Sequence, residues 1–88
     1  MLEIITTKQF EKDIKLSKKR KKDLSKLWSI IAKLSSGRLL EAKHKPHKLF
    51  GNWESFTECH IEPDWLLIYQ VKDKFIYLVR TGSHSDLF

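Results

Sequence analysis

The 88-residue sequence contains little cysteine, glycine or proline, and it has no long hydrophobic run. Cys59 is the only cysteine, which excludes an internal disulfide and a four-cysteine zinc site and fits a reducing compartment. Three glycines offer no glycine-rich phosphate loop. No stretch approaches the roughly 18 apolar residues of a membrane-spanning helix, and an early acid, Glu3, argues against a secretory signal. We therefore expect a cytoplasmic protein that does not enter the membrane.

The residues that are present suffice for one compact domain. Hydrophobic residues make up 41% of the chain and ten residues are aromatic, so it can bury roughly 60 to 68% of its unfolded surface. No repeat or linker divides the sequence, and we predict a single domain over residues 1–88. Seventeen Lys and Arg against eleven Asp and Glu give a net charge of +6. Such a charge attracts polyanions, so nucleic acid is the first partner to test.

The first 22 residues indicate a short strand followed by a helix. The apolar opening predicts a strand at residues 2–5. Residues 6–9 have the Thr-x-x-Gln spacing of a capping box, and Phe10 and Ile14 follow four residues apart, so a helix is expected to begin there. The five cations at 18–22 are expected at a helix end or in a turn, where they stay hydrated.

The region from 24 to 37 carries the clearest helical pattern. Its apolar residues fall at i, i+3, i+4, i+7 and i+10, the stripe of an amphipathic helix: Leu24, Leu27, Trp28, Ile31 and Leu34. Gly37 stands where a glycine commonly ends a helix. Because such stripes face the core, we expect Trp28 to be a packing residue.

The second half of the chain is typical of a β-meander. The helical pattern fades over residues 38–52, which predicts a long loop. Three runs rich in β-branched and aromatic residues follow, at 55–61, 65–71 and 75–80, with Pro63 and Asp73 in the turns between them. The last run is apolar at successive positions, so we expect it to be central and covered on both faces. An N-terminal strand and two helices packed on an antiparallel meander make an α+β fold.

Tight hairpins place chemically active residues at one end of this meander. With turns centred on Pro63 and Asp73, His60 lies opposite Leu66, and Leu66 lies opposite Arg80. Directly opposed residues share a face and neighbouring strands are about 4.8 Å apart, so His60 and Arg80 are expected roughly 10 Å apart. A phosphodiester fits between them.

Three further residues can reach the same end of the sheet: Asp64 in the turn, His84 four residues after Arg80, and His47 in the long loop. This set suits RNA cleavage without a metal. RNA carries its own nucleophile, the 2′-hydroxyl, so the protein supplies a base, an acid for the leaving 5′-oxygen and a cation for the phosphorane. Histidine serves in either proton role, and arginine offers a planar fork of donors.

Each residue also has an ordinary structural interpretation. These interpretations are a surface or hydrogen-bonded residue at His44, a turn residue at Asp64, an ion pair of Arg80 with Glu58 or Glu62, a tail residue at His84 and core packing at Trp65. Trp65 and Phe88 can alternatively stack on bases, as aromatic residues do at single-stranded RNA sites.

Metal and thiol chemistry are less well supported. His44, His47, Cys59 and His60 can be written as a zinc set, but their spacing is unfamiliar and a strand directs Cys59 and His60 to opposite faces. Cys59 also has no activating base on its own face. We therefore predict neither a metal nor a cofactor.

The last 42 residues carry an ordered set of motifs. They read His47-x-Leu49-x-Gly51-x-Trp53, His60-x-x-Pro63-Asp64-Trp65-x-Leu67-Ile68-Tyr69, Arg80-Thr81-Gly82-x-His84 and Leu87-Phe88. This set resembles the YafQ-like branch of the RelE/ParE toxin superfamily. The first half of the chain agrees with that family in layout and length only.

The resemblance implies a RelE-like fold and a toxin of a type II toxin-antitoxin pair. Such a toxin is an endoribonuclease, or mRNA interferase, that cuts messenger RNA on the ribosome and is silenced by a bound antitoxin. The family positions make His84 the general acid, Asp64 and His60 candidates for the base, and Arg80 the phosphate holder. His47 assists or positions, and the substrate-binding candidates are Trp65, Phe88 and Lys48. We expect the free toxin to be a monomer.

The sequence departs from the family at three positions, and two rival functions remain. Family members often carry basic residues where this chain has Glu54 and Thr57, and an acid where it has Pro46. One rival is a same-fold toxin that inhibits a protein target such as gyrase, although the histidine cluster argues against it. The other is a basic module that binds RNA or the ribosome without catalysis.

Overall fold

The computed structural model describes residues 1–88 and contains three α-helices and five β-strands. The α-helices are α1 (Lys8–Lys19), α2 (Leu24–Ser35) and α3 (His84–Leu87). The strands are β1 (Glu3–Thr6), β2 (His47–Lys48), β3 (Thr57–Glu62), β4 (Trp65–Lys72) and β5 (Phe75–Gly82). Two short 3-10 turns, η1 (Ala42–His44) and η2 (Gly51–Trp53), lie in the predicted loop. No helix combines the length and the hydropathy needed to cross a membrane.

All five strands join one sheet in the order β1-β5-β4-β3-β2. The pairs from β5 to β2 are antiparallel, whereas β1 runs parallel to β5 at the sheet edge. Two-residue turns link the meander strands, because Glu62 pairs with Trp65 and Lys72 pairs with Phe75. The predicted α+β class and both tight hairpins are confirmed.

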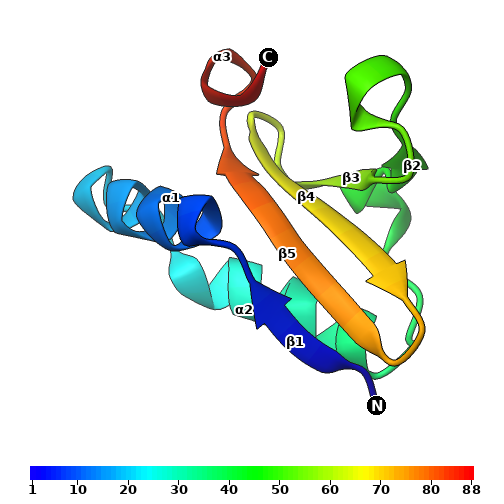
Figure 1. Ribbon diagram of the computed structural model, residues 1–88. Coiled ribbons are helices and arrows are strands. Elements are labelled where there is room, and N and C mark those ends of the chain that lie inside the picture. The colour runs from blue at the N-terminus through cyan, green and yellow to red at the C-terminus, as the bar shows by residue number, and fades with distance from the viewer.

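The main core lies between the sheet and its two long helices. In Figure 1, α2 crosses behind the sheet while α1 packs beside the upper part of β5. Phe10 of α1 and Leu27 of α2 are fully buried against Leu67 and Leu78 of the sheet. A smaller cluster lies on the opposite face, where Leu87 of α3 joins buried side chains of β4.

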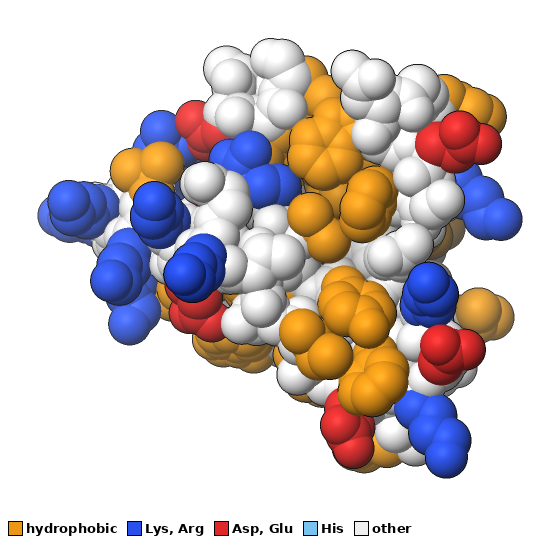
Figure 2. Space-filling view, in the orientation of Figure 1, with side chains coloured by type: hydrophobic (Ala, Val, Ile, Leu, Met, Phe, Trp, Pro, Cys, Tyr) orange, Lys and Arg blue, Asp and Glu red, His pale blue; other side chains and the backbone are white.

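The central strand β5 is covered on one face only. It lies between β1 and β4 as predicted, and Ile76 and Leu78 are fully buried on the helix side. Tyr77 and Val79 are half-buried, so the prediction of cover on both faces is wrong. Both long helices pack on the same side of the sheet, so the second face is covered only in part, by α3 and by the loop side chains that pack on Leu66 and Ile68. Figure 2 shows hydrophobic side chains exposed down the middle of this face.

Two details of the helices differ from the sequence predictions. Thr7 is the N-cap of α1 and accepts a hydrogen bond from the Phe10 amide, because Thr6 still belongs to β1 and pairs with β5. Trp28 is 46% exposed. The buried side of α2 runs through Leu27 and Ile31 and includes Ile30, which lies nearer to the centre of that stripe than Trp28 does.

We expect Cys59 to resist thiol reagents in the folded protein. Its side chain is fully buried on the helix side of the sheet, and burial raises the pKa of the thiol to about 12. The reactive thiolate is therefore about a thousandfold scarcer than for an ordinary cysteine. A thiol-exchange dye should label the native protein very slowly and the guanidinium-unfolded protein within mixing time. Rapid labelling of the native protein would contradict this burial.

Candidate active site

The turn after β3 and the helix after β5 bring Asp64 and His84 together. Ser83 caps α3 in a reciprocal capping box with Asp86, so His84 is the first residue of the helix. The Asp64 carboxylate accepts hydrogen bonds from the His84 amide at 3.0 Å and from His84 Nδ1 at 2.7 Å. These two bonds hold the pKa of Asp64 below its usual value. His84 is therefore an oriented residue and not a tail residue.

An ion pair ties α3 to the end of α1. Arg20 donates to both carboxylate oxygens of Asp86, at 2.6 and 3.2 Å. This fork, together with the Ser83 amide, holds the pKa of Asp86 far below its ordinary value, so the carboxylate stays charged in mild acid. Gly82 packs closely beside it, since a Cβ there would lie 3.0 Å from the Asp86 side chain and would push it aside. The position of His84 thus depends on contacts made by its neighbours.

Three histidine rings line the same end of the sheet. The ring centroids of His60 and His84 are 5.8 Å apart, and those of His47 and His60 are 6.3 Å apart. β2 brings His47 into this group because it pairs His47 with Glu58 of β3. The predicted gathering of His47, His60, Asp64 and His84 at one end of the meander is present.

A buried carboxylate lies between two of these rings. Glu58 has a side chain only 7% exposed, and its oxygens lie 3.3 Å from His47 Nε2 and 3.9 Å from His60 Nε2. The other ring nitrogens face main-chain carbonyls: His47 Nδ1 lies 2.9 Å from the Lys45 oxygen and His60 Nδ1 3.3 Å from the Pro63 oxygen. A carbonyl only accepts, so each Nδ1 is the donor in its contact, and each Nε2 faces the Glu58 carboxylate.

Arg80 is held differently from the prediction. Midway along the β4–β5 pair the register shifts, so Arg80 lies opposite Ile68 and Leu66 lies opposite Gly82. The predicted pairing of Leu66 with Arg80 is therefore wrong, whereas that of His60 with Leu66 is confirmed. A shift of this kind cannot be read from the length of a turn.

The partner of Arg80 is Asp13 of α1, not Glu58 or Glu62. Arg80 donates to both oxygens of this carboxylate, at 2.8 and 3.2 Å, and the Thr81 amide donates to it at 3.1 Å. Asp13 is buried, so the pair fixes the guanidinium plane. Arg80 Nη1 makes no hydrogen bond within the chain and is free to bind an anion.

The three residues predicted to contact the substrate differ in their exposure. Trp65 is 1% exposed and donates from Nε1 to Thr81, so the base-stacking role is wrong and the packing interpretation holds. Phe88 is 59% exposed, with its ring 6.0 Å from that of Trp53. Lys48 is exposed on β2, next to His47. Phe88 and Lys48 are accessible to RNA.

Comparison with known proteins shows the family of this chain. The sequence model described as "Bacterial toxin of type II toxin-antitoxin system, YafQ" matches residues 2–88. The chain belongs to the YafQ toxin family. This confirms the predicted branch, and the RelE-like fold agrees with the solved YafQ structures.

Three relatives show how far the similarity extends. The mRNA interferase toxin YafQ of Escherichia coli K12 is 44% identical over 81 residues, which is 91% of this chain and 88% of that protein. The toxin in the crystal structure of the E. coli DinJ-YafQ toxin-antitoxin complex has a TM-score of 0.90 and 41% identity, covering 99% of this chain and 97% of that one. A metal-bound toxin from Helicobacter pylori has a TM-score of 0.94 and 44% identity, covering both chains fully.

This YafQ-family chain has a set of donors that fits a metal. Ligand atoms of Glu58, His60 and His84 all lie within 4.8 Å of one another. Two imidazole nitrogens and a carboxylate suit zinc or copper, with further positions open. The set differs from the one considered in the sequence, because Cys59 is buried on the helix side and His60 faces His84.

Sequence reasoning missed two residues of the site. Glu58 is two residues before His60 in the same strand, so the alternation of side chains was a signal that both share a face. Asp13 lies 67 residues from Arg80, and no local pattern links them. Its position on the sheet-facing side of α1, among apolar neighbours, was the only indication of a buried carboxylate.

Proposed function

We propose that this chain is a ribosome-dependent endoribonuclease that cuts messenger RNA with the 2′-hydroxyl as nucleophile and without a metal. The observation that carries the proposal is the His84–Asp64 contact together with a second histidine, His60, whose ring centroid lies 5.8 Å from that of His84 and which is backed by the buried Glu58 carboxylate. The 2′-oxygen of the RNA attacks the adjacent phosphorus, and the bond from phosphorus to the 5′-oxygen breaks. The products are a 2′,3′-cyclic phosphate and a 5′-hydroxyl. Such a reaction needs two positioned proton carriers.

His84 acts as the general acid. The Asp64 carboxylate accepts the Nδ1 proton, which fixes the ring and leaves Nε2 to give a proton to the leaving 5′-oxygen. Asp64 itself is a poor base, because its own hydrogen bonds lower its pKa. We therefore assign Asp64 to orienting His84.

His60 acts as the general base. Its Nε2 takes the proton of the 2′-hydroxyl, and the Glu58 carboxylate 3.9 Å away balances the charge that the ring gains. His47 contacts the same carboxylate from the other side and positions it. His60 therefore takes the proton, and Glu58 supports it as the base.

Arg80 stabilises the phosphorane. Asp13 occupies two of its nitrogens and holds the guanidinium in one plane, so Nη1 is presented to the phosphate without loss of side-chain freedom on binding. Phe88 and Lys48 contact the flanking nucleotides by stacking and by charge.

The surface charge supports docking on the ribosome. Exposed lysines line α1 at positions 8, 12, 15, 18 and 19. Figure 2 shows Lys and Arg side chains gathered at the left of the molecule, where Figure 1 places α1. Ribosomal RNA is a polyanion that such a surface attracts. An antitoxin with an acidic segment is the partner that silences the toxin, as the E. coli relative is bound by DinJ.

Primer extension on a messenger RNA in a purified translation system tests this function. Discrete cuts that require ribosomes are expected, with 5′-hydroxyl ends. Equal cutting of messenger RNA without ribosomes would show that the activity does not depend on the ribosome. A complete absence of cuts, with inhibition of a protein such as gyrase, would favour the protein-target function.

Metal removal should leave the activity unchanged. Chelator presaturated with magnesium strips zinc and copper but preserves the ribosomes, and the cutting rate is expected to stay within about twofold. Added zinc or copper should inhibit, because a metal bound by Glu58, His60 and His84 occupies the nitrogens that exchange protons. Loss of activity in chelator with recovery on adding zinc or copper would show a metal-dependent enzyme instead.

A further inference from the structure

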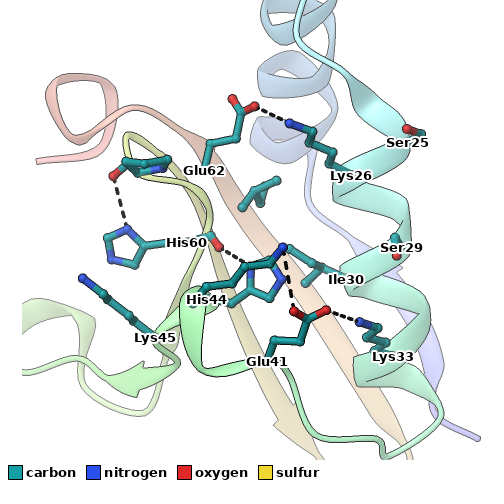
Figure 3. A pocket seen from close by; sticks show the side chains of 13 residues that line it. Ser25, Lys26, Ser29, Ile30, Lys33, Glu41, His44, Lys45, His60 and Glu62 are labelled. Carbon is teal, nitrogen blue, oxygen red and sulfur yellow. Dashed lines mark hydrogen bonds and ion pairs between the residues drawn. The ribbon is translucent and has the colours of Figure 1, made fainter.

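A groove of about 700 Å³ lies between α2 and the η1 segment, and it ends at the active site. Its walls are α2 from Ser25 to Lys33, the segment from Glu41 to Lys45, and the end of β3 from His60 to Pro63. Figure 3 shows the two walls facing each other, with His60 at the end nearest to the catalytic cluster. The volume is in the range of roughly 300 to 1000 Å³ typical of ligand sites, so a nucleotide fits.

Most residues that line the groove have polar or charged side chains, with an excess of positive charge. Only two of its 13 residues are hydrophobic. Four lysines face two carboxylates: Lys26, Lys33, Lys43 and Lys45 against Glu41 and Glu62. A ligand with several anionic groups therefore suits it better than an apolar one.

Lys26 is held by Glu62 at 2.9 Å, but the ion pairs of Glu41 leave Lys33 and Lys43 available. Glu41 is shared by Lys33 at 3.4 Å and Lys43 at 3.7 Å, and these side chains are 30 to 71% exposed. Exposed pairs of this kind contribute little stability, so a phosphate can replace the carboxylate at small cost. Lys45 has no carboxylate within ion-pair distance and is the first cation that a strand leaving His60 would meet.

The groove is also built into the active site. His44 of its wall is buried, and its Nδ1 lies 2.7 Å from the main-chain oxygen of His60. The Lys45 carbonyl accepts from His47, and Lys45 has a left-handed backbone with φ +43°, which is uncommon for a residue other than glycine. In Figure 3 the Lys45 side chain extends beside the His60 ring. One short segment thus connects the groove with two catalytic histidines.

We propose that this groove is an RNA subsite that holds the nucleotides next to the cleaved bond, with Lys43 and Lys45 on their phosphates. The inference rests on the proposed nuclease function, because it needs a single-stranded RNA seated at His60. It adds a path for the strand and two residues that set how the scissile phosphate is presented.

The test is a pair of matched double variants titrated with short RNA. The variant Lys43→Gln/Lys45→Gln removes two groove cations, and Lys72→Gln/Lys74→Gln removes two exposed cations at the far hairpin. The probes are RNAs with a 2′-deoxy sugar at the cleavage position, one extended by two nucleotides on the 5′ side and one on the 3′ side. Amide shifts report where each RNA binds, and titrations at several salt concentrations report the number of phosphate contacts.

One of the two RNAs should shift the amides of Ser29, Lys33 and Lys43 in the wild type. The groove variant should then bind it about tenfold more weakly, with a salt slope smaller by about 1.4, since each lost contact removes about 0.7. Equal weakening by both double variants would reduce the effect to general charge and overturn the subsite. Shifts of these amides by the acidic antitoxin segment alone would assign the groove to the antitoxin and overturn it as well.

The two proposals fail separately. Ribosome-dependent cutting by the wild type with no RNA signal in the groove would overturn only the subsite. An absence of cutting by the wild type would overturn the nuclease function, whatever the groove binds.

Discussion

Replacing His84 by Ala is expected to lower the rate of cutting of bound messenger RNA by about 10² to 10⁴-fold, the usual contribution of a positioned proton donor. The side chain is 54% exposed and its only side-chain hydrogen bond is to Asp64, so the fold should not change. Single-turnover primer extension with saturating toxin measures the chemical step apart from binding.

Ser85→Ala is the matched control, because Ser85 is the next residue of α3 and is exposed. It should cut at the wild-type rate. Asp64→Asn should lose activity by a smaller factor, since an amide oxygen still accepts from Nδ1 but cannot stabilise the charged ring. A wild-type single-turnover rate for His84→Ala would exclude His84 as the acid.

Replacing Arg80 by Ala is expected to lower the same rate by about 10² to 10³-fold, the usual effect of removing one donor to a transition-state oxyanion. This variant also leaves the buried Asp13 without its partner, and breaking a buried pair in this way costs about 3 to 5 kcal/mol of stability. Loss of activity could then come from unfolding.

Arg80→Lys separates the two effects. It keeps a cation for Asp13 but cannot bind the carboxylate with two nitrogens and a phosphate with the third. We expect a melting temperature closer to that of the wild type and a rate nearly as low as that of Arg80→Ala. If Arg80→Lys binds RNA more weakly but cuts the bound RNA at the wild-type rate, Arg80 is a docking residue and not a catalytic one.

Local patterns predicted most of the elements and part of the site. The stripe of α2, the two hairpin turns and the pairing of His60 with Leu66 follow from side-chain periodicity and turn chemistry, which act over a few residues. The chemistry of Asp64 and His84, with the turn and strand end that carry them, predicts both as site residues, and they meet in the structure.

The failures concern properties that depend on distant parts of the chain. The prediction that Trp28 packs in the core is wrong, because apolar residues flank the stripe of α2 on both edges, with Trp28 on one edge and Ile30 on the other. Only packing against the sheet decides which edge is buried. The sequence leaves RNA binding and core packing both open for Trp65, because aromatic residues beside a turn occur on protein surfaces as well as in cores. Its burial depends on Thr81, 16 residues away, and on the helices above it.

By itself the sequence determined the class of fold, the basic surface, the meander and the list of chemically capable residues, because composition and short-range periodicity are sufficient for these. The tertiary structure alone decided the environment of each residue. Packing α1 against β5 buried Asp13 beside Arg80, the register shift between β4 and β5 moved Arg80 opposite Ile68, and pairing β2 with β3 set Glu58 between two histidines. Hydrogen-bond partners and proton-carrying roles follow from such long-range contacts, and no local pattern in the chain encodes them.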